Sequence, residues 1–183
     1  MPLRPLSTND IRLAAGWMRR EDVFQWLDFG NGKQSLDELT LKVMLQRPQH
    51  CLRIFTADGT DSPIGLVVLT DIDQLMRTAQ LWYVLGEAAY GREGYATRAV
   101  GLLLDHAFHA LRLESIHAWV VELNQASIRV LQKNGFRQAG RLRHAHRLHG
   151  EPLDRLYFDL LASEWVDRST SDAAATALRG ARS

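Results

Sequence analysis

Four segments of the chain repeat apolar residues every three or four positions, which is the spacing of one helical face. These segments are Asp10–Arg20, Ser35–Arg47, Tyr95–Leu113 and Gln125–Asn134. Ser35 followed by Glu38 has the pattern of a capping box, so the second helix is expected to begin at Ser35. Gly135 directly follows the fourth segment, where a glycine is the usual helix terminator.

Seven other segments are bounded by turn signals and have the composition of strands. They are Leu3–Leu6, Cys51–Thr56, Ile64–Thr70, Ala79–Leu85, Ser115–Leu123, Arg137–His146 and Leu153–Leu161. The nearly continuous apolar run Ser115–Leu123 predicts a strand buried on both faces. An antiparallel run placed before a single β-α-β unit predicts an α+β fold, with a mixed, mostly antiparallel central sheet and flanking helices. This order excludes a doubly wound nucleotide-binding fold.

Composition narrows the class of protein. The 183 residues fit one domain, and 22 Lys+Arg against 21 Asp+Glu leave a net charge of +1. That balance argues against nucleic acid and anionic membranes as partners. A single cysteine excludes a disulfide framework, and no apolar run reaches the ~18 residues of a membrane helix, so we expect a cytoplasmic protein. The apolar pattern stops after Trp165, which predicts a domain over residues 1–165 and a flexible tail over residues 166–183.

The segment Gly91–Thr97 combines small residues with the start of the longest predicted helix. Small residues at 91, 94 and 96 let a ligand approach the backbone, and the first amides of a helix lack partners within it. Together they form an anion site suited to a diphosphate, to which Arg92 or Arg98 would add charge. From these residues alone, a tight strand-to-helix turn is the favoured interpretation. A phosphate loop is disfavoured, because Gly94 is followed by Tyr95 and Ala96 in place of Lys and Ser or Thr.

From about Leu3 to Trp165, and most strongly from Leu81 to Asp159, the chain resembles the GNAT superfamily of acyl-CoA-dependent N-acetyltransferases. Gly94 and Ala96 match the last two positions of its Gln/Arg-x-x-Gly-x-Gly/Ala loop, whereas Gly91 stands where Gln or Arg is usual. The block from Asn124 to Phe136 is similar to the Asn-x-x-Ser…Asn-Gly-Phe segment of the superfamily. This second block is especially like the branch that acetylates the N-termini of ribosomal proteins.

The resemblance implies acetyl-CoA (coenzyme A) as cofactor and a set of residues that bind it. It places the acyl carbonyl beside the main chain of Val84 and Leu85, and the pantetheine beside Asn124. Ser127 is the position proposed to protonate the leaving thiolate, although it is equally placed to cap a helix. The pyrophosphate loop and the further cofactor contacts would comprise Gly91, Arg92, Glu93, Gly94, Tyr95, Ala96, Thr97, Lys133 and Asn134. Asn134 is also readable as an ordinary residue at the end of a helix.

The general base is the least determined part of the predicted site. The ribosomal-protein branch is thought to use a glutamate whose position corresponds to His146 here, and an imidazole accepts a proton near neutral pH. Neighbouring arginines would lower the pKa of His146, and an exposed strand with basic residues on its wet face is the alternative interpretation. Glu122, Asp71 and Asp73 are alternative bases acting through water. His144, His146 and His149 lack a convincing further ligand, so no metal is expected.

Other side chains are candidates for the acceptor site or for the core. Trp26 and Asp71 are predicted to contact the acceptor, and Arg143, on a strand with three further arginines, favours an acceptor with a carboxylate or phosphate. Tyr83 and Tyr157 are alternatives to Ser127 as the acid. Core positions are predicted for Trp17, Phe108 and Trp119.

The expected function is transfer of an acetyl group from acetyl-CoA to a primary amine, by direct attack in a ternary complex. The acceptor is a protein N-terminus or a small molecule such as a polyamine, an amino acid or an aminoglycoside-like drug. The alternative is a non-catalytic acyl-CoA-binding sensor or interaction module on the same fold. The sequence leaves the oligomeric state open, with a homodimer as one arrangement.

Overall fold

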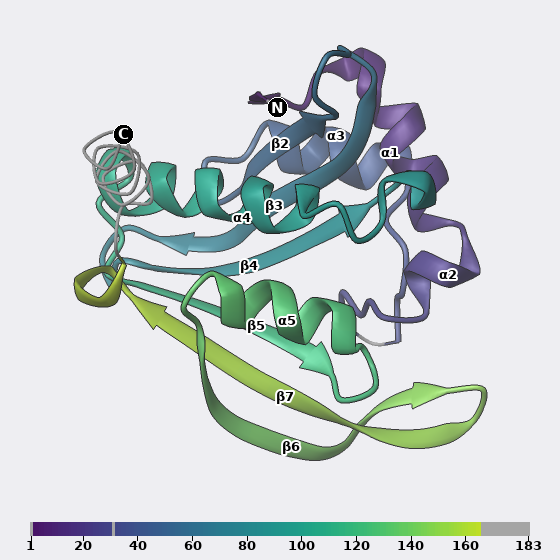
Figure 1. Ribbon diagram of the computed structural model, residues 1–183, viewed down its shortest axis with the longest axis vertical. Helices are drawn as coiled ribbons and strands as arrows, with labels where there is room; N and C mark the ends of the chain where they lie inside the picture. Colours follow the sequence, from purple (N-terminus) through teal and green to yellow (C-terminus); the bar gives the residue numbers. More distant parts are fainter. Residues whose placement is uncertain (1, 31, 166–183) are drawn as a thin grey trace, which may run out of the picture.

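The computed structural model describes residues 2–30 and 32–165, and these residues build a seven-stranded mixed sheet in the order β1-β2-β3-β4-β5-β7-β6 (Figure 1). All pairings are antiparallel except that between β4 and β5, so the predicted α+β class is confirmed. The strands are β1 (Leu3–Pro5), β2 (Cys51–Thr56), β3 (Pro63–Asp73), β4 (Thr78–Leu85), β5 (Ser115–Val121), β6 (Arg137–Leu148) and β7 (Glu151–Leu161). The predicted tail, residues 166–183, lies outside the described residues.

The helices are α1 (Ile11–Met18), α2 (Glu21–Phe24), α3 (Glu38–Leu45), α4 (Tyr95–Asp105) and α5 (Gln125–Lys133), with a π turn over His106–Ala110 that prolongs α4. Short 3₁₀ turns cover Thr8–Asp10, Ala88–Tyr90 and Ala162–Glu164. The predicted start of the second helix at Ser35 is wrong. Asp37 is the N-cap of α3, and its carboxylate accepts a hydrogen bond from the amide of Thr40 at 2.8 Å.

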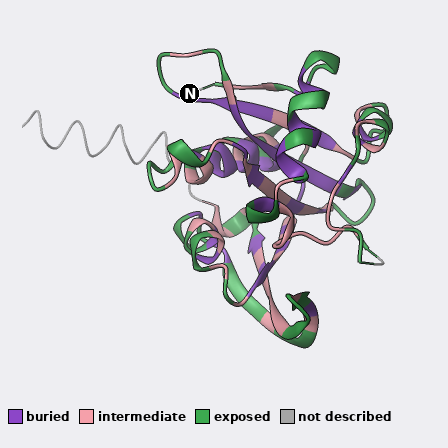
Figure 2. Ribbon diagram, turned by 90° about the vertical axis from the view of Figure 1, so that its right-hand side faces the viewer, coloured by how far each residue is buried: buried purple, intermediate pink, exposed green. Residues whose placement is uncertain are grey.

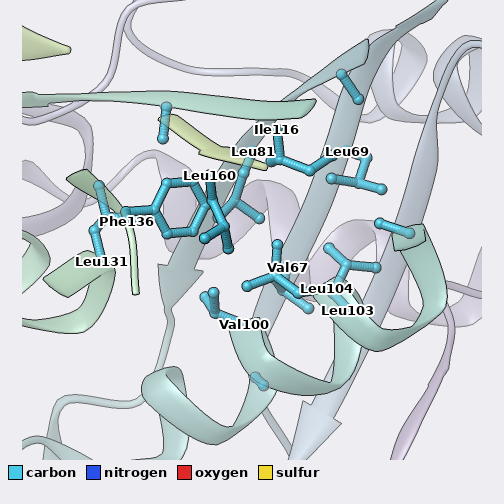
Figure 3. Packing of buried hydrophobic residues seen from close by; sticks show 14 of the residues in the cluster. Val67, Leu69, Leu81, Val100, Leu103, Leu104, Ile116, Leu131, Phe136 and Leu160 are labelled. Carbon is cyan, nitrogen blue, oxygen red and sulfur yellow. The ribbon is translucent and has the colours of Figure 1, made fainter. Parts of the chain in front are cut away.

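The sheet separates two apolar cores. Helices α4 and α5 cover one face, where Leu103 and Leu104 of α4 pack with Val67 of β3 and with residues of β5 and β7 (Figure 3). Helices α1 and α3 cover the other face, where Met18 and Leu41 pack with alternate residues of β2 and β3. Because β3 lies between two covered faces, it is apolar almost throughout, from Ile64 to Thr70.

Strand β5 differs from its prediction in a way that matters for the site. Its residues alternate between buried and half-buried positions, so it is not buried on both faces. Trp119, predicted to lie in the core, is half-buried and faces a cavity, whereas Trp17 and Phe108 are buried as predicted. This difference arises from the tertiary structure. Only the first three residues of β4 pair with β5, so the rest of β5 has no strand beside it on the β4 side.

Strands β6 and β7 form a long hairpin at the edge of the sheet, with most of β6 exposed (Figure 2). Its register shifts between Leu142 and His146, where His144 has a positive φ of 54°. The amide of His144 donates to the Asp154 carboxylate at 2.9 Å across this irregularity. A bulge of this kind bends a hairpin and re-aims its side chains. Here His146 is directed inward, because its ring contacts the segment after α2.

Candidate active site

A cleft opens in the middle of the sheet. The parallel pairing of β4 with β5 ends at Gln80 and His117, and beyond this point the two strands separate (Figure 1). Between them lies a cavity of about 690 Å³, lined by Gln80–Leu85 of β4 and Ala118–Val120 of β5. Cavities of this size hold small-molecule ligands and cofactors. Val84 and Leu85, the predicted neighbours of the acyl group, both line it.

The loop before α4 forms one end of this main cavity. Gly94 is the N-cap of α4 with φ of +82°, a left-handed conformation that favours glycine. The first amides of α4 have no partner within the helix, which makes this end a site for an anion. Of the predicted loop residues, all but the exposed Glu93 line the cavity: Gly91, Arg92, Gly94, Tyr95, Ala96 and Thr97.

The two arginines of this loop have different surroundings. Arg92 lines the cavity, in a left-handed conformation with φ of 67°. Arg98 forms an ion pair with Asp58 at 2.7 Å and lies 4.7 Å from the centre of the Tyr95 ring. Arg92 is therefore the arginine of this loop placed to add positive charge at the cavity.

Helix α5 contributes Asn124 and Ser127 to the cavity wall. The Asn124 side chain accepts a hydrogen bond from the Ser127 amide at 3.1 Å, so Asn124 is the N-cap and the capping role predicted for Ser127 is wrong. This bond uses the Asn124 carbonyl oxygen, and its NH₂ group makes no hydrogen bond within the part of the chain that the structure describes. The hydroxyl of Ser127 is not needed to cap α5, because Asn124 provides the cap.

Two predicted cofactor contacts lie at the end of α5, and only one of them lines the cavity. Lys133 lines the cavity. Asn134 is 2% exposed and donates to the carbonyls of Thr97 at 3.2 Å and Val130 at 2.9 Å. It therefore joins α5 to α4, as expected for a structural residue, and it does not reach the cavity wall.

Tyr83 is another residue with a hydroxyl that lines the cavity. Its oxygen is buried and makes no hydrogen bond among the described residues. Burial raises the pKa of Tyr83, and the nearby Ser127 partly offsets this rise. The phenol therefore stays protonated at neutral pH and lies beside Ser127 as a second possible proton donor. Tyr157, the other predicted alternative, does not line the cavity.

Neither predicted base lines the main cavity. The Glu122 carboxylate accepts from Arg141 at 2.6 Å and from the amide of Asp154 at 3.0 Å, so both of its oxygens are engaged. His146 is 5% exposed and its Nε2–H donates to the carbonyl of Gln25 at 2.7 Å. Burial, as the largest cause, lowers the pKa of His146. It lines a second cavity, of about 360 Å³.

The predicted positions of Asp71, Asp73 and Arg143 at the cleft are corrected by the structure. Thr70 pairs with Gln80 and Asp73 with Thr78, so both aspartates lie at the joined end of β4 and β5 rather than at the open end. Arg143 is exposed on β6 and lines neither cavity. The sequence indicates where these strands end, but it does not indicate at which end β4 and β5 separate.

Two carboxylates that the sequence reasoning missed do line the main cavity within the described chain, Asp22 and Asp28. The two aspartates lie on either side of Trp26 in the sequence, and Trp26 also lines the main cavity. The aromatic residues of this loop were therefore the sequence feature that could have indicated them. Asp22 pairs with Arg20 at 2.5 Å, which lowers its pKa. Asp28 pairs with Arg155 and accepts from the Gly30 amide at 2.7 Å. No group of three or more metal-ligating side chains occurs among the residues described.

Comparisons with known proteins agree with this geometry. Residues 1–137 match the family model of the acetyltransferase (GNAT) domain, so the chain belongs to the GNAT family, whose cosubstrate is acetyl-CoA. Over the residues described, no helix is both long and apolar enough to cross a membrane.

Relatives of known sequence are N-acetyltransferases by name. Probable N-acetyltransferase YjcK of Bacillus subtilis (strain 168) is 42% identical over 98 residues, 53% of each chain. Spermidine N(1)-acetyltransferase of Escherichia coli (strain K12) is 27% identical over 149 residues, 81% of this chain and 79% of that one. The chain spans only 53% and 60% of the length of the first two curated relatives that it matches.

Solved structures share the fold. A spermidine N-acetyltransferase from Vibrio cholerae, in complex with CoA and spermine, has a TM-score of 0.77 at 19% identity, over 89% of this chain and 96% of that one. Mycobacterium smegmatis RimJ in complex with CoA-disulfide has a TM-score of 0.72 at 22% identity, over 88% and 82%. These likenesses establish a common fold.

Proposed function

We propose that this protein transfers the acetyl group of acetyl-CoA to a primary amine, which attacks directly in a ternary complex. The observation that carries the proposal is the continuous cavity that runs from the separated strands β4 and β5 to the N-terminus of α4. An elongated molecule with a diphosphate at one end fits such a cavity. The names of the relatives, spermidine N(1)-acetyltransferases among them, support the same reaction class.

The cavity residues would divide the binding of acetyl-CoA among them. The loop around Gly94 would hold the pyrophosphate through backbone amides, with charge from Arg92 and Lys133. Asn124 would bind the pantetheine through its unused NH₂ group. The main chain of Val84 and Leu85 would hold the acyl carbonyl, since main-chain donors there need no particular side chain.

Proton transfer completes the proposed reaction. The amine nitrogen forms a bond to the acetyl carbon as the carbon–sulfur bond breaks. The leaving thiolate takes a proton from a hydroxyl of the cavity, and the proton that the nitrogen loses restores this hydroxyl. Ser127 and Tyr83 are the proposed donors, because both residues line the cavity and lie beside each other.

The amine must lose a proton before it attacks, and we propose His146 as the base, acting through water. Its lowered pKa keeps the ring neutral at pH 7, and its Nε2–H bond to Gln25 leaves Nδ1 as the proton acceptor. Asp28 lines both cavities and connects the region of His146 with the cleft. Glu122 is not proposed, because it lines neither cavity.

A thiol-release assay with acetyl-CoA and a panel of primary amines tests this function. We expect release of coenzyme A thiol that depends on the amine and saturates with it. Coenzyme A binding without thiol release across the whole panel would instead support the non-catalytic sensor. A cytoplasmic location and a homodimer belong to the proposal as well, and native mass measurement of the purified protein tests the second.

A further inference from the structure

The second cavity adjoins the main cavity and is built by segments far apart in the sequence. Its walls come from the loop between α2 and α3, from the end of β6 and from β7. Asp28 lines both cavities, and Arg155 of β7 forms an ion pair with it. Arg155 also lies 4.2 Å from the centre of the Trp119 ring, and Trp119 lines the main cavity. The Asp28–Arg155 pair therefore stands at the boundary between the two cavities.

This ion pair is largely withdrawn from solvent and incompletely satisfied. The side chains of Arg155 and Asp28 are 14% and 18% exposed. Nε of Arg155 is buried and makes no hydrogen bond within the described residues. A buried donor without an acceptor is unfavourable, and most buried polar groups in proteins are paired. The guanidinium therefore keeps hydrogen-bonding capacity that Asp28 does not use, which favours a further anion beside it.

Positively charged side chains outnumber carboxylates in the second cavity. Arg147 also lines the second cavity, and Asp28 is its one carboxylate among the described residues. Arg147 donates to the carbonyl of Gly150 at 2.8 Å and forms no ion pair with any carboxylate of the described residues. Asp28 neutralises one of the two arginines, so the cavity keeps a net positive charge next to a single carboxylate.

We propose that the Asp28–Arg155 pair recognises the acceptor, and that the acceptor carries a carboxylate close to its reacting amine, as a free amino acid does. Asp28, on the main cavity, would bind the ammonium group before it is deprotonated. Arg155 would bind the carboxylate in the second cavity, since a planar guanidinium matches a carboxylate through two parallel hydrogen bonds. The inference rests on the proposed function and narrows its substrate class.

The same residues disfavour a polyamine. A polyamine offers only positive charge, so Arg155 and Arg147 would repel its distal groups. A protein N-terminus has a neutral amide in place of the nearby carboxylate, so it would leave the guanidinium of Arg155 without a ligand carboxylate. The inferred acceptor class therefore differs from the one in the names of the spermidine-acetylating relatives.

The test is a thiol-release assay at saturating acetyl-CoA with three kinds of acceptor: the common L-amino acids, their carboxamides, and spermidine. We expect at least one amino acid to exceed its own carboxamide by tenfold or more in kcat/KM, and spermidine to be poorer still. A tripeptide with the same first residue serves as the model of a protein N-terminus and should behave like the carboxamide.

The variant Arg155→Gln tests whether Arg155 binds the carboxylate of the acceptor. It should raise KM for the preferred amino acid by tenfold or more, at least fivefold beyond any change in KM for the carboxamide, and leave KM for acetyl-CoA within twofold. Arg155→Lys should recover only part of the loss. The control is Arg137→Gln: Arg137 is an exposed arginine of β6 that pairs with Glu164 at 2.8 Å and lines neither cavity.

The outcomes separate this inference from the proposed function. Equal rates with amino acid and carboxamide, or preference for spermidine or the tripeptide, overturn the inferred acceptor class and leave the acetyltransferase activity in place. Absence of thiol release with every amine overturns both. A melting curve will show whether Arg155→Gln folds. If it does not, the ratio of kcat/KM for the amino acid to kcat/KM for its carboxamide, measured on the unaltered protein, tests the inference.

Discussion

Gly94 adopts a backbone conformation that other residues reach only at a free-energy cost of about 1–2 kcal/mol. A Cβ atom added there would meet no other atom within 4 Å, so the position is open toward the cavity. We expect Gly94→Val to lower affinity for acetyl-CoA at least tenfold, because the side chain would occupy the approach to the α4 amides. Isothermal titration measures this affinity.

Gly59 supplies the control for this change. It also has a positive φ, +75°, with nothing within 4 Å of an added Cβ, but it lies in the turn between β2 and β3. Gly59→Val should lower the melting temperature about as much as Gly94→Val and leave coenzyme affinity intact. Normal affinity in Gly94→Val would refute the assignment of the loop.

Ser127 and Asn124 allow capping and catalysis to be separated. Because Asn124 caps α5, Asn124→Ala should lower stability by about 1 kcal/mol. Ser127→Ala removes no cap, so it should lower kcat with little change in KM and in the melting temperature. Steady-state kinetics and thermal unfolding of both variants check this. A large stability loss in Ser127→Ala with unchanged kcat would contradict the role of proton donor.

At the scale of elements, an ion pair attaches β1 to the turn that begins α1. The two guanidinium nitrogens of Arg4 contact the two carboxylate oxygens of Asp10 at 2.6 and 2.8 Å, and the Ser7 hydroxyl donates to Asp10 at 2.6 Å. The Arg4 guanidinium, as the largest cause, holds the pKa of Asp10 well below its usual range. The side chain of Asp10 is only 9% exposed.

The sign of the pH effect follows from this lowered pKa. The pair stabilises the fold fully above the pKa of an unfolded aspartate, about 3.9, and the contribution is lost as pH falls toward the folded pKa. Asp10→Asn should therefore lose about 1–3 kcal/mol at pH 7 and show a weaker decline in stability below pH 4. Denaturant unfolding at several pH values measures both effects.

Glu114→Gln is the control for an exposed pair, since Glu114 and its partner Arg77 are 63% and 51% exposed. Exposed pairs contribute about 0–1 kcal/mol, so this variant should behave almost like the unaltered protein. Equal losses from Asp10→Asn and Glu114→Gln would contradict the anchoring role of the Arg4–Asp10 pair.

At the scale of the whole molecule, the packing of the central strands requires glycine at position 65. A Cβ there would lie 2.2 Å from the ring of Phe55 and 2.5 Å from the carbonyl of Val84. Gly65→Ala would push β4 away at the place where it lines the cleft, and should lower the free energy of unfolding by about 1–3 kcal/mol. Denaturant unfolding measures the loss.

Gly140→Ala is the matched change, because an added Cβ there meets nothing within 4 Å and the backbone has no positive φ. Its effect should stay within about 0.5 kcal/mol. If both alanine variants lost the same stability, close packing around Gly65 would not be the reason for its glycine.

The apolar pattern and two local motifs determined much of this protein by themselves. They predicted the seven strands, four of the helices, the α+β class and the glycine-containing loop before α4, because alternation, helical spacing and capping are properties of neighbouring residues. Helix α2 was missed, since a helix of four residues is too short to show a period.

Only the tertiary structure decided where β4 and β5 separate, and therefore which side chains line the cleft. It removed Asp71, Glu122 and Arg143 from the cavity wall and brought in Asp22 and Asp28. Asp28 and Arg155 are 127 residues apart in sequence, yet they form one ion pair between the two cavities. Local patterns carry no information on such contacts, because strand divergence and hairpin curvature arise from packing across the whole sheet.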